Sequence, residues 1–414
     1  MLTRRQFSKF VLSATPTVLG ARASLADSLA GEPAPQSVEC DILIKGGTVI
    51  DPSQNLHAVM DVAVKDGKVI EVLPEIPAGR ARKIISAKEK IVTPGLIDVH
   101  VHVFDGATLG GVNADRTCLA HGVTTVVDGG SCGYPSIAGF RKYVVDTSAT
   151  RIYALVDIGA LGTLVGVTDT LKNLDWVNPK LAAKAAEENK PVVVGIKARL
   201  SKEIVGSDDL EIVKRAREAA TISNLPMMLH IGNTPSPLKD IFPMMREGDI
   251  ITHCYTPRAH GIVDENGKIL PEVIEARQRG IRFDIGHGTS HFGFDLAESC
   301  LQQDFPPDTI STDLAAFSIN GATRDFITVL SKFLLLKMSL DKVIEIATVN
   351  ASKAFNLGVQ LGTLKPGSVA DVSVLEMASG SFDLVDTLGK TRVANEKLMS
   401  VAVIRDGKLV GTSI

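Results

Sequence analysis

Two histidines, His100 and His102, lie two residues apart in the apolar stretch 94–103, which reads PGLIDVHVHV. Side chains two apart in a β-strand point to the same face, so both imidazoles can contact one metal ion. The valines around them face the opposite side of the strand. An isolated His-x-His pair is equally typical of an ordinary protein core, so its interpretation depends on residues further along the chain.

Four further polar residues each follow a short apolar run. Lys197 follows VVVGI, His230 follows MML, His253 follows IIT and Asp313 follows IST. Amines, imidazoles and carboxylates bind metal ions or act as bases. If each run is a strand that ends at the same rim, six such groups meet there, an arrangement that chance does not readily explain.

The elements that must position these groups alternate between short apolar strands and helices. This alternation favours a parallel sheet, and a count of eight strands predicts a closed (β/α)8 barrel whose active site lies at the carboxyl ends of the strands. The expected helices include residues 179–188, 210–223 and 340–354. The expected strands are residues 96–103, 123–128, 152–158, 192–197, 227–231, 250–253, 281–285 and 309–313.

Both ends of the chain outside this barrel carry short alternating strands separated by Gly-Gly and Asp-Gly turns. Such turns are typical of β-hairpins. The sequence therefore predicts a small β-sandwich domain built from residues 38–94 plus 358–414, and a barrel domain over residues 95–357.

The first residues have the pattern of a targeting segment. Residues 3–9 read TRRQFSK, a twin-arginine pattern, and a mildly apolar run with small residues follows. We expect residues 1–26 to be a signal peptide that directs export to the periplasm. An amphipathic tail that stays attached is the alternative. The run is far shorter than the about 20 residues that span a bilayer, so no stable membrane anchor is expected.

Composition excludes several classes of partner and site. The 414 residues carry a formal charge of −3 without a basic stripe, which argues against nucleic acid and leaves a small molecule as the expected ligand. The five cysteines stand at irregular spacings without a C-x-x-C pair, so the sequence indicates neither a disulfide framework nor a thiolate zinc site.

Three segments together resemble the amidohydrolase superfamily of metal-dependent hydrolases. They are DILIKGGTVI near the start, IVTPGLIDVHVH around the histidine pair, and KPGSVADV near the end. Within that superfamily the chain is similar to the dihydroorotase-like branch and to a group of predicted amidohydrolases that includes acetyl-mandelate esterases. The resemblance implies the same barrel, a split β-sandwich and hydrolysis at a metal centre.

By this resemblance, His100 and His102 would hold the more buried of two divalent metal ions, and His230 and His253 the other. Lys197 would be carboxylated by carbon dioxide and would bridge both ions. Keeping an unperturbed lysine neutral at pH 7 costs roughly 4–5 kcal/mol, so burial and two cations are needed to favour the carbamate. Pairing of Lys197 with a nearby carboxylate is the alternative. Zinc is the expected metal, although this ligand set also accepts manganese, iron or cobalt.

The resemblance also assigns Asp313 as the last metal ligand and the catalytic proton shuttle. A metal can lower the pKa of its bound water to about 7, and the resulting bridging hydroxide would attack the carbonyl carbon while Asp313 moves the proton to the leaving group. An aspartate that caps the following helix is the alternative. His287 lies between glycines beyond the seventh strand, and we expect it to contact the substrate or to stabilise an oxyanion.

Other polar residues near strand ends are expected to form walls of the site rather than to act in catalysis: His291, Tyr255, Arg199 and Cys132. His57, His121 and His260 have no comparable placement.

These observations lead to one functional hypothesis and two alternatives. The hypothesis is a binuclear hydrolase of an amide or ester bond in a small molecule, with deacylation of an N-acyl or O-acyl acid as a candidate reaction. The alternatives are a mononuclear deaminase of the same superfamily and a non-catalytic periplasmic metal- or solute-binding homologue. The sequence shows no arginine pattern of the sort that dihydroorotases use to bind a substrate carboxylate. A role in pyrimidine synthesis is therefore not expected. Substrate identity and oligomeric state stay open, since loops set the first and homo-oligomers are common.

Overall fold

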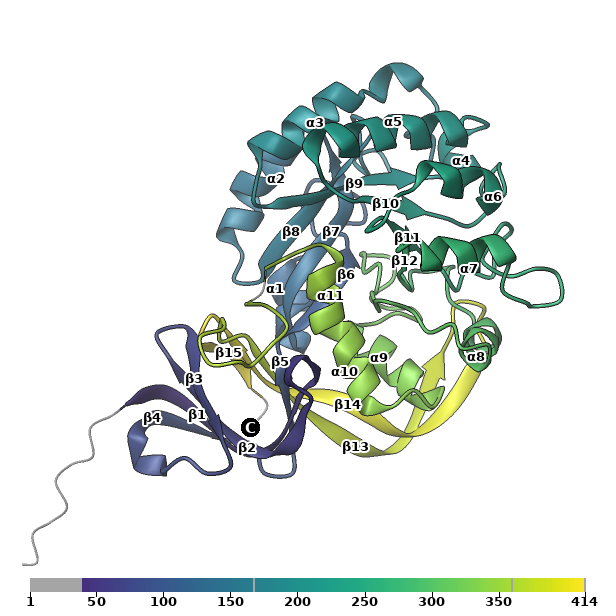
Figure 1. Ribbon diagram of the computed structural model, residues 1–414. Coiled ribbons are helices and arrows are strands. Elements are labelled where there is room, and N and C mark those ends of the chain that lie inside the picture. Colours follow the sequence, from purple (N-terminus) through teal and green to yellow (C-terminus); the bar gives the residue numbers. More distant parts are fainter. Residues whose placement is uncertain (1–38, 167, 359, 413–414) are drawn as a thin grey trace, which may run out of the picture. The chain divides into compact units, whose positions relative to one another are not determined.

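The computed structural model describes residues 39–166, 168–358 and 360–412, so the signal peptide predicted over residues 1–26 lies outside the described residues. The described chain contains a parallel sheet surrounded by helices and a second, mixed sheet (Figure 1). None of the described helices has the length and apolar character needed to cross a membrane.

The parallel sheet carries the predicted polar residues. Its strands lie side by side in chain order, each parallel to the next, as expected when helices connect consecutive strands. Except for Arg151 and Tyr153 near the start of β8, almost every residue of these strands is buried, which explains why they appear in the sequence as continuous apolar runs. The strands are β6 (Leu96–Val101), β7 (Val123–Gly133), β8 (Arg151–Asp157), β9 (Val193–Arg199), β10 (Met227–His230), β11 (Ile250–Thr252) and β12 (Arg282–Phe283).

The segment expected to be the eighth strand closes the barrel without forming a regular strand. Parallel bridges join Thr309 to Asp284 beyond β12, and Leu314 to Val101 in β6. The backbone of Asp313 adopts a left-handed conformation with φ 49°, which interrupts a strand at this point. The barrel therefore consists of seven regular strands and one irregular closing segment, which corrects the prediction of eight regular strands.

Helices follow the strands and cover the outside of the barrel (Figure 1). For α3, Asn178 caps the first turn by accepting from the Leu181 N–H at 3.1 Å, and Pro179 occupies the first helical position. The helices are α1 (Ala114–Thr117), α2 (Ile137–Tyr143), α3 (Pro179–Glu188), α4 (Lys202–Val205), α5 (Asp209–Ser223), α6 (Leu238–Ile241), α7 (Pro271–Gln278), α8 (Phe294–Gln302), α9 (Phe326–Leu335), α10 (Leu340–Ala347) and α11 (Val349–Ala354).

The second sheet combines both ends of the described chain. Figure 1 shows its early strands in purple beside its last strands in yellow. The order is β15-β14-β13-β5-β1-β2-β3, and β4 also pairs with β1. Its strands are β1 (Cys40–Asp51), β2 (Leu56–Lys65), β3 (Lys68–Leu73), β4 (Ala81–Ser86), β5 (Ile91–Pro94), β13 (Val372–Val385), β14 (Thr391–Arg405) and β15 (Lys408–Thr412).

This pairing makes one continuous eight-stranded sheet, whereas the sequence led us to expect a sandwich of two sheets. Adjacent Asp-Gly turns connect β2 to β3 and β14 to β15, and all four turn residues have positive φ, as the tight hairpin turn requires. Gly95 alone separates β5 in this sheet from β6 in the barrel. The mixed sheet therefore leads directly into the strand that carries the histidine pair.

Candidate metal and active site

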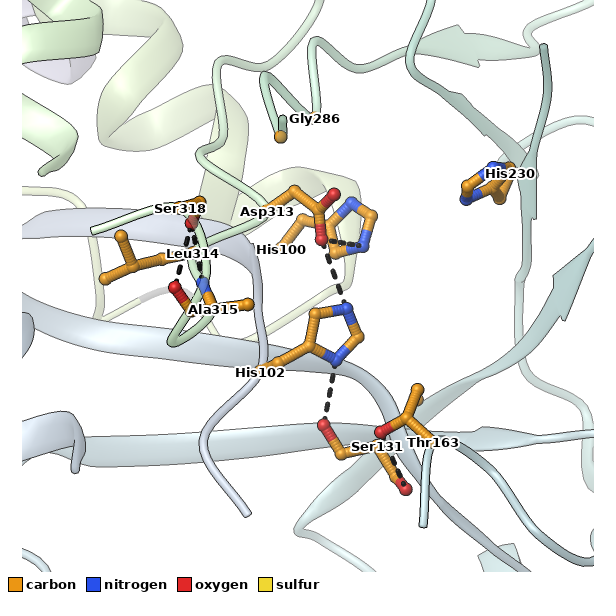
Figure 2. A network of polar contacts seen from close by, with 12 residues as sticks. His100, His102, Ser131, Thr163, His230, Gly286, Asp313, Leu314, Ala315 and Ser318 are labelled. Carbon is orange, nitrogen blue, oxygen red and sulfur yellow. Dashed lines mark hydrogen bonds and ion pairs between the residues drawn. The ribbon is translucent and has the colours of Figure 1, made fainter. Parts of the chain in front are cut away.

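His100 lies in β6 and His102 directly follows it, and both side chains lie on the inner side of the barrel, as the two-residue spacing predicts. The His100 side chain is 1% exposed and that of His102 is 12% exposed. Nε2 of His102 lies 3.1 Å from Oδ1 of Asp313, and Nε2 of His100 lies 3.5 Å from the same oxygen (Figure 2). The first strand and the closing segment of the barrel therefore bring three potential ligands to one point.

Lys197 lies in β9 and is completely buried. Its Nζ is 2.9 Å from Nε2 of His100 and 3.4 Å from Sδ of Met228. No ion pair with a carboxylate forms within the described part of the chain at this amine. Burial lowers the pKa of Lys197 to about 8, which raises the fraction of neutral amine near neutral pH.

His230 ends β10 and His253 directly follows β11. Nε2 of His253 lies 2.9 Å from Nδ1 of His230, so the two rings direct nitrogens at a common point. Burial lowers the pKa of both imidazoles well below its usual value. His253 has a left-handed backbone with φ 67°, an unusual conformation for a residue other than glycine that occurs preferentially at functional sites.

A hydrogen bond at the second ring nitrogen orients most of these imidazoles. Nδ1 of His253 lies 2.6 Å from the Gly286 carbonyl oxygen and must donate to it, because a carbonyl oxygen only accepts. Nδ1 of His102 lies 2.8 Å from the Ser131 hydroxyl (Figure 2). Nε2 of each ring is therefore the nitrogen that faces the other candidate ligands, and metal-binding histidines are usually held in this way.

His100 is oriented through a relay that the sequence analysis missed. Its Nδ1 lies 3.0 Å from Oγ1 of Thr252, and this hydroxyl lies 2.7 Å from Oδ2 of Asp284. The carboxylate accepts from the hydroxyl, which can in turn accept from the imidazole. Asp284 and Thr252 each stand near the end of a short strand, and their position behind a histidine of another strand becomes visible only in three dimensions.

Asp98 is a second buried carboxylate that the sequence analysis missed. It accepts from the Thr312 hydroxyl at 2.6 Å and from the Thr312 N–H at 3.1 Å. Burial raises the pKa of Asp98 to about 8, and these hydrogen bonds oppose the shift. The position of Asp98, two residues before His100 and so on the same face of β6, is the sequence signal that could have identified it.

Glycines provide the room that the ligands need. A Cβ atom at Gly129 would lie 2.2 Å from Cδ2 of His100, and one at Gly130 would lie 2.8 Å from Cβ of Lys197. A Cβ at Gly288 would lie 2.6 Å from Oδ2 of Asp313. Each distance is too short for a real contact, so the packing around the ligands requires glycine at these positions.

A pocket of about 410 Å³ opens in front of these groups. His100, His102, Lys197, His230 and Asp313 line its base, and it lies at the carboxyl ends of the barrel strands, as predicted. Arg199 at the end of β9 and Glu203 in α4 line it as well. Loop residues complete its walls, including Leu109, Thr163, Ser201, Arg258, Thr289, Ser290, His291 and Phe317.

The residues expected to form walls divide into two groups. Arg199 lines the pocket and donates to the Gly162 carbonyl at 2.6 Å, and its Nε lies 3.3 Å from Asp157. His291 lines the pocket as well. Tyr255 and Cys132 are fully buried and do not line it, and the Tyr255 hydroxyl donates to the Phe305 carbonyl instead. His57 lies far from these residues in β2, where it contacts Asp341 at 2.8 Å.

His287 does not reach the pocket, although we expected it to contact the substrate. Its side chain is completely buried, its ring stacks on Phe292 with 4.7 Å between ring centroids, and its Nε2 lies 2.7 Å from Nζ of Lys332. The glycines on both sides instead bring the backbone close to His253 and Asp313. The geometry therefore supports a positioning role for the His287 loop and gives no support to direct substrate contact.

The donor set fits a divalent-metal centre. Buried imidazoles with lowered pKa values, one carboxylate and one buried amine converge, and zinc and similar ions bind such nitrogen and oxygen donors. Two overlapping groups have their ligand atoms within 4.8 Å of one another. The groups are His100, His253 and Asp313, and His230, His253 and His291.

Comparison with known proteins gives consistent results. The sequence profile of the Amidohydrolase family matches residues 91–410. A deacetylase from Enterococcus faecalis is 32% identical over 90% of this chain and 99% of its own length. A solved structure described as an adenine deaminase is 32% identical, has a TM-score of 0.83, and aligns with 89% of this chain and 99% of its own. A solved dihydroorotase structure is 27% identical, has a TM-score of 0.81, and aligns with 90% of this chain and 99% of its own.

Proposed function

The chain belongs to the Amidohydrolase family, and from this premise we propose that it is a binuclear metal-dependent hydrolase that cleaves an amide or ester bond in a small molecule. One observation carries the proposal. Six potential ligands from five segments of the barrel come together, and five of them line one pocket. One of the six is the buried Lys197, whose nearest polar neighbours are not carboxylates.

We assign the ligands by residue. His100, His102 and Asp313 would hold one divalent ion, His230 and His253 the other, and a carbamate formed from carbon dioxide on the Lys197 amine would be shared by both. Zinc suits these donors. When bound, the ions would supply a nucleophile at neutral pH and polarise the carbonyl group of the substrate.

Asp313 is the residue that would move the proton. Its Oδ1 faces Nε2 of both His100 and His102, whereas its Oδ2 lies beside Gly288 without a hydrogen-bond partner among the described residues. Oδ2 is therefore available to take a proton and to deliver it to the leaving group. The side chain lines the pocket and is 19% exposed, so a substrate can reach it.

The names of the relatives bear on the type of bond. Several of the similar proteins, including the one from Enterococcus faecalis and one from Agrobacterium fabrum, are named deacetylases. We therefore place an N-acyl or O-acyl acid first among candidate substrates. The solved structure described as an adenine deaminase keeps deamination as a second candidate. A mononuclear deaminase would not need a modified Lys197, so the state of this amine distinguishes the two.

The proposal predicts that replacing Lys197 by alanine abolishes hydrolysis and reduces bound metal. The wild-type protein, purified without chelator, is expected to contain about two metal ions per chain and to hydrolyse members of a screen of esters and N-acyl amino acids. Lys197→Ala should bind less metal and should lack this activity, because the shared ligand is gone. Elemental analysis and product detection give the two readouts.

A carbon-13 label provides the control for the chemical state of the amine. Exposure of apoprotein to labelled bicarbonate and zinc should give a carbamate resonance in the wild type and none in Lys197→Ala. A metal-free protein with full activity would contradict the proposal. A metal-loaded protein inactive on every ester and amide would favour the deaminase or a non-catalytic metal- or solute-binding homologue.

We also propose that the protein is exported to the periplasm by the twin-arginine route. The support is the TRRQFSK pattern at residues 3–9. That route carries folded proteins, which suits a chain that takes up its metal ions before export.

A further inference from the structure

His291 lies over the second pair of histidines. Its ring stacks on His253, with 4.0 Å between ring centroids and 25° between ring planes. It meets His230 edge-on at 4.9 Å. The side chain lines the pocket and is nearly buried, with 5% of its surface exposed. His291 is therefore held against two proposed metal ligands while one edge of its ring faces the space that a substrate would occupy.

Thr256 determines which nitrogen of His291 carries the proton. Its Oγ1 lies 3.1 Å from Nδ1 of His291 and accepts from the backbone N–H of Arg258 at 3.3 Å. The hydroxyl is buried, so its own proton needs an acceptor. Within the described part of the chain, Nδ1 of His291 is the acceptor in reach. A neutral imidazole that accepts at Nδ1 carries its proton on Nε2.

The surrounding loops fix this contact. Gly232, in the loop after β10, has φ 109°, and a Cβ atom there would lie 3.0 Å from Oγ1 of Thr256 and 3.4 Å from Nδ1 of His291. Loops that follow three different strands therefore meet at the hydrogen bond between Thr256 and His291. The Nε2–H of His291 makes no hydrogen bond with another described residue, which leaves it free for a ligand.

We propose that His291 is a further catalytic residue, a hydrogen-bond donor through Nε2–H to the substrate oxygen that becomes negatively charged during hydrolysis. Thr256 is the positioning residue that keeps His291 in the donating tautomer. The proton stays on Nε2 throughout, so no net transfer is required. A donor already in place stabilises the developing charge without the cost of reorganisation. The inference rests on the hydrolase function proposed above.

The first experiment separates donation from packing. His291→Phe keeps an aromatic ring against His253 but has no donor, whereas His291→Gln keeps an N–H group of similar reach. With an acetate ester or N-acetyl amino acid that the wild type hydrolyses, we expect His291→Phe to lower kcat about 100-fold with little change in KM, as for loss of one oxyanion donor. His291→Gln should recover part of this loss.

The second experiment tests the role of Thr256. Thr256→Val retains the shape of the side chain without the hydroxyl, and we expect it to lower kcat about tenfold because the donating tautomer is no longer favoured. Thr256→Ser should restore the wild-type kcat. Nitrogen-15 spectra of the zinc-loaded protein should show a protonated Nε2 and a bare Nδ1 for His291, with this pattern lost in Thr256→Val.

Three results would overturn the inference. Loss of metal from His291→Phe would show that His291 is a metal ligand. A raised KM with unchanged kcat would show that it only contributes to substrate binding. Unchanged kinetics would show that it only forms part of the pocket wall. If the wild type hydrolyses nothing, the proposed function fails first. Two readouts then still decide the role of His291. They are the nitrogen-15 spectrum and the affinity for a methylphosphonate that mimics the tetrahedral intermediate, which His291→Phe should weaken about 100-fold.

Discussion

Around the candidate metal centre, each imidazole directs one ring nitrogen towards the site. A hydrogen-bond partner at the second ring nitrogen holds the ring in that orientation. The relay from Asp284 through Thr252 to His100 is the most buried of these, since all three side chains are at most 1% exposed. A partner of this kind fixes both the ring orientation and the position of its proton. If the candidate site holds metal as proposed, its affinity for the ion should therefore depend on residues that do not themselves reach the ion.

We predict that Thr252→Val weakens metal binding about 10- to 100-fold, the usual cost of removing such a partner. The substitution keeps the shape of the side chain but breaks the hydrogen bonds to His100 and Asp284. Competition with a chelator of known affinity measures the effect. Thr252→Ser is the matched control and should bind metal as the wild type does. Equal affinities for Thr252→Val and the wild type would refute the relay.

The positions of the candidate ligands were predictable at the scale of single residues, but their hydrogen-bond partners were not. His100, His102 and Lys197 each belong to an apolar strand whose end must carry the site, so their type and position were informative. Thr252, Thr256 and Asp284 are also polar residues near strand ends, yet their importance depends on contacts with other strands and loops. His287 illustrates the opposite error, because the glycines around it bring the backbone, rather than its ring, close to the site.

Among the elements, β7 shows how closely a strand can approach a neighbour's side chain. Gly129 leaves space for His100 from the adjacent strand β6, and Gly130 leaves space for Lys197 from β9, the strand beyond β8. In the strand order, β7 therefore lies between two parts of the candidate metal centre. Both glycines follow Asp128, whose Oδ2 accepts from the Val103 N–H at 2.9 Å and thereby ties β7 to the end of the histidine segment.

We predict that Gly129→Ala greatly reduces metal content and activity, because the new methyl group would occupy the place of the His100 ring. Gly129 does not have the positive φ of the left-handed region, so the substitution adds no backbone strain that would confuse the result. Gly139→Ala in α2 is the control. It has open space around it and should retain activity with a stability gain of about 0.5–1 kcal/mol. Equal metal content and equal activity in Gly129→Ala and Gly139→Ala would contradict the prediction.

Lys332 connects α9 to two other parts of the fold. Its Nζ lies 2.7 Å from the Ala322 carbonyl, the Val385 carbonyl at the end of β13, and Nε2 of His287. Burial lowers the pKa of Lys332 to about 7, below its value in the unfolded chain. Between these two pKa values the unfolded state binds more protons than the folded state, so this group makes the fold more stable as the pH rises from about 7 towards 10 and less stable as it falls.

We therefore predict that wild-type stability relative to Lys332→Met increases between pH 7 and pH 9, by at most about 1.4 kcal/mol per pH unit. Melting temperatures of both proteins, loaded with the same metal and measured across this range, provide the test. Effects of pH on the metal centre are common to both proteins and cancel in the difference. A difference that stays constant, or that shrinks with rising pH, would show that Lys332 does not titrate as described.

The fold was predictable from the sequence to the level of these elements, with two instructive exceptions. The alternation of apolar runs and helices identified the barrel, because a buried parallel strand must be apolar on both faces. The closing segment at 309–313 was expected to be a regular strand, but Asp313 adopts positive φ there. The second sheet was expected to be a sandwich, and alternation within strands cannot distinguish one continuous sheet from two.

At the scale of the whole molecule, the export proposal concerns residues before the described fold. We predict that changing Arg4 and Arg5 to lysine keeps the protein in the cytoplasm, whereas the wild type accumulates in the periplasm, because the twin-arginine signal is read by a receptor. Fractionation of cells that produce each protein provides the measurement. Lys9→Arg is a control that retains the arginine pair. If the wild type and the variant with lysine at positions 4 and 5 were distributed equally between cytoplasm and periplasm, that result would contradict the proposal.

The mixed sheet joins residues that are made at very different times. Thr93 of β5 pairs with Ser373 of β13, 280 positions later in the chain. A ribosome therefore completes the entire barrel sequence before β5 can acquire this neighbour, and until then one edge of the early strands has no partner. Exposed strand edges of this kind invite aggregation, so nascent chains should depend on chaperones until the final hairpin emerges, and premature termination should yield insoluble fragments even when every metal-site residue has been synthesised.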